Sequence, residues 1–188
     1  MNDDLSVYLA KYTAYVEEEA YWHISEHDYT YHLRIRNFAT DELPPDGYAT
    51  SVRCLLFQGD KIMLMHSSFG DTHIVPGGRI EGGESYNDTL RRELLEETGW
   101  TVKSSQFIGT RHFKHMKPKP HFYPPTYHFP HFLQVVYFAE AAAFVEGAKL
   151  EDDYELSGEF MPIDDVQKLT LTPGELLYLK TALEKRKK

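Results

Sequence analysis

The sequence predicts an α/β protein, more closely α+β, in which one mixed sheet carries two helices. Three observations support this fold class. Short apolar segments bounded by turn residues recur through the middle of the chain. A segment with helix-start and helix-stop signals interrupts them near residue 86, and a second follows residue 172. With 188 residues, of which 41% are hydrophobic, the chain is long enough for one full core and short for two, so we expect one domain with an appendage.

The appendage is predicted to be residues 1–47, an extension with one helix and one strand. Apolar residues recur at helical spacing from Leu5 to Val16, which predicts an amphipathic helix over about residues 4–20. Apolar and polar residues then alternate from Tyr29 to Ile35, as expected for a strand, and a proline-containing linker follows. The aromatic stripe would cover the main domain or form a homodimer contact, and both remain open.

The main domain is predicted to be residues 48–188. Two apolar runs between Ser51 and Met65 flank a turn sequence and predict a hairpin, and a short strand is expected at residues 73–75. Further strands are expected at about residues 101–113, 131–140 and 156–163. A C-terminal helix should begin after Thr172-Pro173 and run to about residue 186.

The helix that begins at Tyr86 has capping residues at both ends. Ser85 can accept a hydrogen bond from the first turn, with Asp88 three positions later, and Gly99 is suited to the left-handed residue that ends a helix. The segment is therefore predicted to be a glycine-rich loop leading into a helix of roughly 12 to 14 residues.

Three carboxylates of this helix share one arc. At about 100° per residue, Glu97, Glu93 and Glu96 lie about 20°, 60° and 120° from Leu90, all on the same side. Unpaired acids beside an apolar face are costly, so a cation is expected there, and Mg²⁺ or Mn²⁺ prefers oxygen ligands. Arg92 has Glu96 as its i+4 neighbour and could hold a carboxylate in place. The alternative is a solvated acidic helix face.

The segment GRIEGGESYNDTLRRELLEETGW, residues 78–100, resembles the Nudix box G-x5-E-x7-R-E-U-x-E-E-x-G-U at every charged and glycine position. Only Trp100 departs, since the family usually has an aliphatic residue there. The resemblance implies a Nudix-type α/β/α sandwich and a divalent-metal-dependent pyrophosphohydrolase that uses Mg²⁺, with Mn²⁺ possible. Its strong part covers residues 76–100, and none is found for the first 47 residues.

The resemblance also assigns residues to roles. Glu93, Glu96 and Glu97 would bind metal, the Gly78 carbonyl would join them, and Glu84 and Arg92 would orient them. Together with Arg92, the three glutamates form the candidate catalytic set. Glu159, in a Gly-Glu-aromatic sequence, resembles a late metal ligand of some nucleoside-triphosphate members. The general base stays open among Glu93, Asp152, Asp153, Glu155 and Glu159.

Substrate contacts are expected outside the box. Residues 112–131 hold five of the ten histidines and five of the ten prolines, a composition typical of a long loop. Lysines there could meet phosphate and aromatic rings could stack on a base, while a stiff lid of packed aromatic residues is the alternative. The candidate substrate residues are Arg53, Arg79, Arg111, Lys117, Phe122 and Tyr127.

Three functions follow from the resemblance. The first is hydrolysis of a diphosphate bond in a nucleoside diphosphate linked to another group, by water attack on phosphorus. The second is a nucleoside-triphosphate pyrophosphohydrolase that removes modified nucleotides. The third is a Nudix ligand sensor without turnover, against which the complete set of box acids argues.

Composition narrows the partners and the compartment. The net charge of −9 argues against nucleic acid and anionic membranes as partners. No apolar run approaches about 18 residues and no leader is evident, so we expect a cytoplasmic protein. Cys54, the single cysteine, lies in an apolar run and is expected to be a core thiol.

Overall fold

The computed structural model describes residues 3–68, 70–125, 127–150 and 155–187. Its elements, in chain order, are α1 (Asp3–Ala10), β1 (Val16–Ile24), the 3-10 turn η1 (Ser25–His27), β2 (Tyr29–Ala39), β3 (Ala49–Gln58), β4 (Lys61–Ser67), β5 (Thr72–His73), α2 (Tyr86–Thr98), β6 (Trp100–His115), β7 (His131–Phe144), β8 (Glu155–Pro162), α3 (Ile163–Val166) and α4 (Pro173–Arg186). No helix in these ranges is long and apolar enough to span a membrane.

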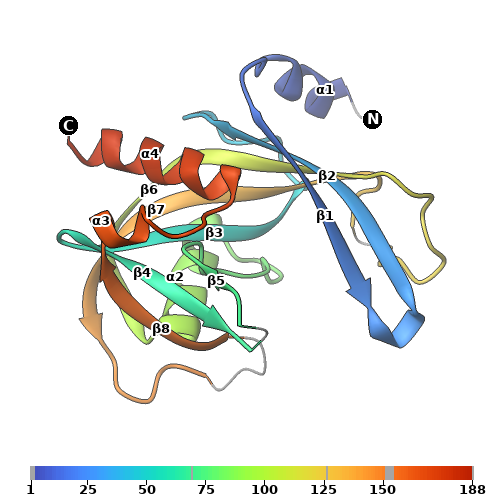
Figure 1. The fold of residues 1–188 in the computed structure, drawn as a ribbon. Coiled ribbons are helices and arrows are strands. Elements are labelled where there is room, and N and C mark those ends of the chain that lie inside the picture. Colours follow the sequence, from blue (N-terminus) through green and yellow to red (C-terminus); the bar gives the residue numbers. More distant parts are fainter. Residues whose placement is uncertain (1–2, 69, 126, 151–154, 188) are drawn as a thin grey trace.

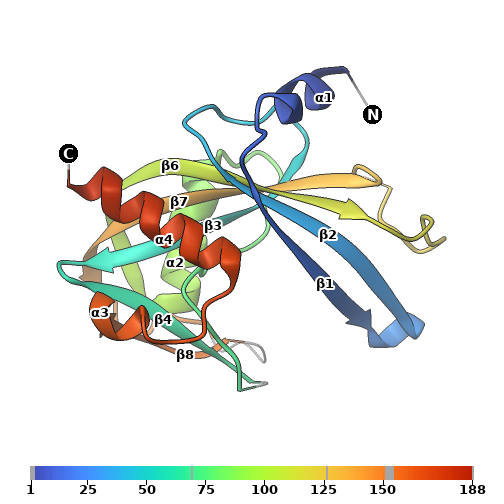
Figure 2. The same cartoon turned by 45° about the horizontal axis from the view of Figure 1, so that its top comes forward.

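The eight strands of the described residues form one sheet. A mixed sheet was predicted, but without β1 and with β2 in a separate extension. The order of the strands is β1-β2-β6-β7-β3-β4-β5, with β8 paired to β4. The pair β3–β7 is parallel and the other pairs are antiparallel. Helix α4 lies across one face of the sheet and α2 across the other (Figures 1 and 2). We call these the front face and the back face. The α/β/α arrangement is thus confirmed.

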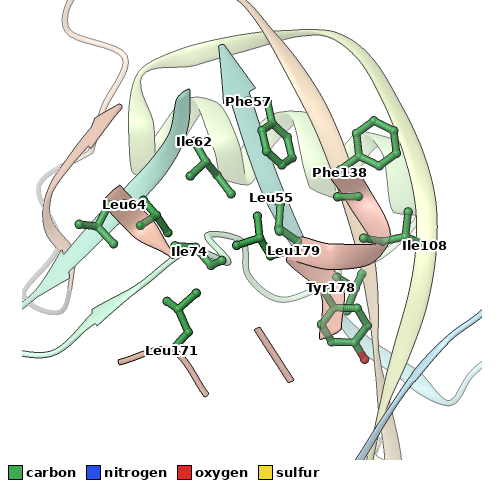
Figure 3. Packing of buried hydrophobic residues seen from close by; sticks show 13 residues of the cluster. Leu55, Phe57, Ile62, Leu64, Ile74, Ile108, Phe138, Leu171, Tyr178 and Leu179 are labelled. Atoms are coloured by element: carbon green, nitrogen blue, oxygen red, sulfur yellow. The ribbon is translucent and has the colours of Figure 1, made fainter. Parts of the chain in front are cut away.

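Successive side chains of β3 point to opposite faces of the sheet, so each face has its own core. Leu55 and Phe57 point to the front, where they pack with Tyr178 and Leu179 of α4 (Figure 3). The Tyr178 hydroxyl, although buried, donates a hydrogen bond of 2.8 Å to the Thr110 carbonyl, which offsets the cost of burying it.

The back face of β3 packs against α2. Cys54 and Leu56 contact the apolar side of that helix through Leu90 and Leu94. Burial raises the pKa of the Cys54 thiol, and the side chain is 1% exposed, so the prediction of a core thiol is confirmed.

The prediction for the N-terminus is wrong after residue 10. Helix α1 ends at Ala10, and residues 16–24 form strand β1 instead of further helical turns. The helical spacing is real in α1, where Leu5 and Tyr8 are buried against Phe38. From Val16 onward, the chain gains a complete antiparallel ladder with β2, and this long pairing outweighs the local preference.

The extension therefore contains one helix, α1, and two strands, β1 and β2, which join the sheet. The tip of the β1–β2 hairpin and the loop of residues 116–125 and 127–130 project beyond the body of the protein on the same side (Figures 1 and 2). Strand β6 continues to His115, two residues past its predicted end, because it pairs with β2 as far as Leu33–His115. The proline-rich loop consequently begins at residue 116, four residues later than predicted.

Candidate active site

Helix α2 begins and ends where the capping residues predicted. The Ser85 side chain accepts from the Asp88 amide, the Asp88 side chain accepts from the Ser85 amide, and Gly99 takes the left-handed conformation at the C-terminus. The loop before the helix runs along the edge of β3 that β4 leaves unpaired. Val52 N–H donates to the Gly78 carbonyl and Cys54 N–H to the Pro76 carbonyl, each at 2.9 Å.

Arg92 joins three carboxylates. Its Nε and Nη2 donate to the two oxygens of Glu84 at 2.7 and 2.9 Å, a bidentate fork. Its Nη1 donates to Glu93 at 2.9 Å and to Glu96 at 3.1 Å, and its Nη2 also reaches the Arg79 carbonyl at 2.9 Å. The hydrogen bonds from Arg92, followed by that from the Thr89 hydroxyl, lower the pKa of Glu84 to about 2. Glu84 is therefore a fixed anion that orients the arginine.

Glu93 and Glu97 contact the glycine loop. The Glu93 carboxylate lies against Gly78, and its side chain is only 12% exposed. Burial raises the pKa of Glu93, although the Arg92 hydrogen bond acts in the opposite direction. Glu97 accepts a 2.6 Å hydrogen bond from the Gly77 amide. The structure thus gathers Gly78, Arg92 and the three predicted box carboxylates at one place.

The residues present suit a hard divalent cation. All would coordinate through oxygen, and the Glu93 carboxylate, whose pKa is raised by burial, would be stabilised as an anion by a neighbouring cation. The Gly78 carbonyl uses one lone pair for Val52, and a carbonyl oxygen has two. Within the described ranges, no three His, Cys, Asp or Glu side chains already converge as a metal site. Arg92 and the Gly77 amide hold the carboxylates instead.

Glu159 has its partner outside this cluster. It lies on β8, where its carboxylate oxygen is 3.3 Å from Nε2 of His66 on β4, and its side chain is 63% exposed. Asp152 and Asp153 lie outside the described residues, and of Glu155 the structure describes only the backbone, at the start of β8.

A pocket of about 510 Å³ opens beside the glycine loop. Four predicted substrate residues line it, namely Arg53, Arg79, Phe122 and Tyr127. Arg53 links the pocket to the box, because its Nη1 donates to the Gly77 carbonyl. The loop glycines therefore lie between the carboxylates on one side and the pocket on the other.

Two predicted substrate residues do not line this pocket. Arg111 donates to Asn37 and to Gln134, both at 3.2 Å, and it supports the pocket wall through Gln134. Lys117 donates to the Thr30 carbonyl at 2.9 Å and lies over the Tyr29 ring. Both cations are occupied in holding strands and the loop together.

The pocket also has walls that the sequence did not predict. They come from the β1–β2 hairpin and from the ends of β6 and β7: Trp22, Ile24, Tyr31, His115, Phe132 and Gln134. The Tyr31 ring meets the rings of His115 and Phe122 edge to face. Burial, followed by the charge of His131, lowers the pKa of His115 to about 4, so this imidazole is neutral near pH 7. The alternation around Tyr31 predicted a strand, but nothing local indicates which strand it would pair with.

Comparisons with known proteins agree with this geometry. The model of the NUDIX domain matches residues 47–181. An uncharacterized Nudix hydrolase of Bacillus subtilis (strain 168), YvcI, is 37% identical over 60 residues, which cover 32% of this chain and 38% of that protein. Diphosphoinositol polyphosphate phosphohydrolase 3-beta of Bos taurus is 32% identical over 81 residues, 41% of this chain and 48% of that protein. The matches thus span less than half the length of these relatives.

A solved structure extends the likeness over more of the fold. A mutant form of the Bacillus subtilis pyrophosphohydrolase BsRppH superposes with a TM-score of 0.57 at 17% identity, covering 89% of this chain and 96% of that one. At this identity the likeness concerns the fold alone. Because the family match includes both α2 and the strands that support it, this chain belongs to the Nudix family.

Proposed function

We propose that this protein is a divalent-metal-dependent hydrolase that cleaves a diphosphate bond in a nucleoside diphosphate linked to another group. The observation that carries the proposal is the position of the glycine loop. Gly78 touches the Glu93 carboxylate on one side, and the neighbouring Gly77 carbonyl accepts from Arg53 of the pocket on the other. A diphosphate lying along this loop would place its phosphorus atoms at the carboxylates and its organic group in the pocket.

Gly78, Glu93, Glu96 and Glu97 would hold Mg²⁺, or Mn²⁺ in its place. When bound, the ions supply charge screening and a more acidic water. The chain's own groups then have separate tasks. Arg92 and Glu84 keep the carboxylates in position, and Arg53 and Arg79 would bind phosphate oxygens.

The attacking water must lose a proton. A raised pKa brings a carboxylate closer to the range in which a general base is effective, and burial raises the pKa of Glu93. Its hydrogen bond to Arg92 fixes the orientation of the carboxylate. Glu159, which is paired with His66, is the second candidate for the base and for a late metal ligand.

The pocket favours a nucleoside over a highly charged organic group. Its volume of about 510 Å³ is in the usual range for small-molecule sites. Its aromatic walls include Trp22, Tyr31 and Phe122, which offer rings for stacking on a base. A diphosphoinositol polyphosphate, the substrate class in the name of the Bos taurus relative, carries many phosphates, while only Arg53 and Arg79 among the lysines and arginines line the described pocket.

The test is a panel of ADP-ribose, nucleotide sugars, dinucleoside polyphosphates and nucleoside triphosphates, each incubated with Mg²⁺ and with chelator. We expect metal-dependent release of two phosphate-bearing products from one of the first three classes. Release of pyrophosphate from triphosphates would favour the nucleoside-triphosphate alternative. If calorimetry shows that a panel member binds but neither Mg²⁺ nor Mn²⁺ supports its turnover, the proposal of a hydrolase is refuted and a ligand sensor is favoured.

A further inference from the structure

A second, strongly cationic pocket lies on the back face of the sheet beside α1. Its volume is about 210 Å³. It is lined by residues of α1, β2, β6 and β7: Leu9, Arg34, Arg36, His112, Lys114 and His131. Along β7, His131 alternates with Phe132 and Gln134, which line the pocket at the box. The two pockets are therefore on opposite faces and share no residue.

The strand register places its cations directly opposite one another. Arg34 is paired with Lys114, which is in turn paired with His131, and Arg36 is paired with His112. Like charges in cross-strand pairs destabilise a sheet unless something compensates them. Such a row indicates a site built to face negative charge.

The surrounding carboxylates compensate this charge only in part. Glu17 lies 3.2 Å from Arg36 Nε but 3.9 Å from Arg34 Nε, and it is the carboxylate that meets both. Glu19 lies opposite Arg34 in the β1–β2 register, as Glu17 lies opposite Arg36, but the Glu19 carboxylate is hydrogen-bonded to His32. The ammonium of Lys114 has no hydrogen bond or ion pair to any residue in the described ranges.

Two buried polar atoms of the pocket residues also lack hydrogen-bond partners within the part of the chain that the structure describes: Arg34 Nε and His112 Nδ1. A guanidinium Nε always carries a proton, so a buried one without an acceptor is costly. His112 is 4% exposed, and its other ring nitrogen, Nε2, lies 2.9 Å from His131 Nδ1. If His131 donates in that contact, the free His112 Nδ1 carries a proton and is a second unused donor.

We propose that this pocket binds a small oxyanion of the phosphate class. Arg34, Arg36 and Lys114 provide charge-assisted donors, and an acceptor would select the His112 tautomer with its proton on Nδ1. A volume of about 210 Å³ suits a phosphate or diphosphate group and is too small for a whole nucleotide to be enclosed. The site does not depend on the proposed hydrolase, because no box residue takes part in it.

Calorimetry in chelator tests the site with three probes: inorganic phosphate, pyrophosphate and AMP. Chelator keeps divalent metal away from the box carboxylates. We expect Lys114→Gln to weaken binding about tenfold, the value of one charge-assisted hydrogen bond. Lys103→Gln, which changes an exposed lysine at the far end of the same strand, should leave binding unchanged. Binding of phosphate and pyrophosphate alone identifies a free inorganic anion, whereas equal binding of AMP identifies the phosphate group of a nucleotide.

A second measurement uses the unmodified protein, so it does not depend on the folding of a variant. The ¹⁵N resonances of the His112 and His131 rings should shift on addition of the bound probe, as one tautomer is selected. Equal affinities of the Lys114→Gln and Lys103→Gln variants for every probe would overturn the proposal. So would histidine resonances that stay in place at saturating probe.

Discussion

Replacing Gly78 by alanine should displace one carboxylate and leave the fold intact. An added Cβ would lie closer than 3.0 Å to all three atoms of the Glu93 carboxyl group, whereas ordinary contact begins at 3.4 Å. The carboxylate would have to withdraw by roughly 1 Å, and a displacement of this size can cost about 100-fold in rate, or about 2.7 kcal/mol of transition-state free energy. Gly78 has no positive φ, so the backbone itself tolerates alanine.

Gly82→Ala is the matched control. It makes the same change in the same loop, also without a positive φ, but its Cβ would meet no atom within 4 Å. The first measurement is kcat/KM at saturating Mg²⁺ for the substrate that the panel identifies. The second is the affinity for Mn²⁺, obtained from the electron paramagnetic resonance signal of the unbound ion. We expect a large loss of activity and weaker Mn²⁺ binding in Gly78→Ala only, with similar melting temperatures. Activity within about threefold of the unmodified protein would refute the assignment of Glu93 to the site.

Three other expectations can be checked with the same protein. Glu97→Gln should remove most turnover but not the fold, since it keeps the acceptor for the Gly77 amide and loses the charge; full activity would contradict a metal role. In chelator, the raised pKa of Glu93 should add to the free energy of unfolding below about pH 4.5. This contribution should be lost as the pH rises through the raised pKa, and the urea midpoint should fall accordingly. Glu93→Gln should flatten this profile, and an unchanged slope would exclude Glu93 as its source. Shortening residues 116–128 to a linker should change substrate ranking more than metal dependence, because the loop supplies Phe122 and Tyr127 to the pocket; an unchanged ranking would make the loop purely structural.

The box helix could be predicted closely because its signals are local. Ser85, Asp88 and Gly99 act within one turn of the helix ends, so the chain needs no distant partner to define them. The contact between Arg92 and Glu96 follows from their i,i+4 spacing on the helix.

The pocket could not be predicted in the same way, since its walls meet only through strand pairing. Tyr31 reaches the pocket because β2 pairs with β6, and His115 because β6 extends to meet β2. Local patterns also failed for residues 11–20, where Tyr12 and Tyr15, at helical spacing, lie in the segment between α1 and β1, and Val16 begins a strand. The short helix α3 gave no periodic signal of its own.

The pairing of β2 with β6 also has a consequence during synthesis. Leu33 pairs with His115, which follows it by 115 − 33 = 82 positions. At about 5 to 20 residues per second, roughly 4 to 16 s pass before the partner strand exists. During that interval the β1–β2 hairpin has no strand to pair with on its inner edge, and its apolar side chains, Trp22 and Ile35 among them, remain without their cover. We therefore expect chaperones to bind nascent chains that contain the β1–β2 hairpin but do not yet contain β6.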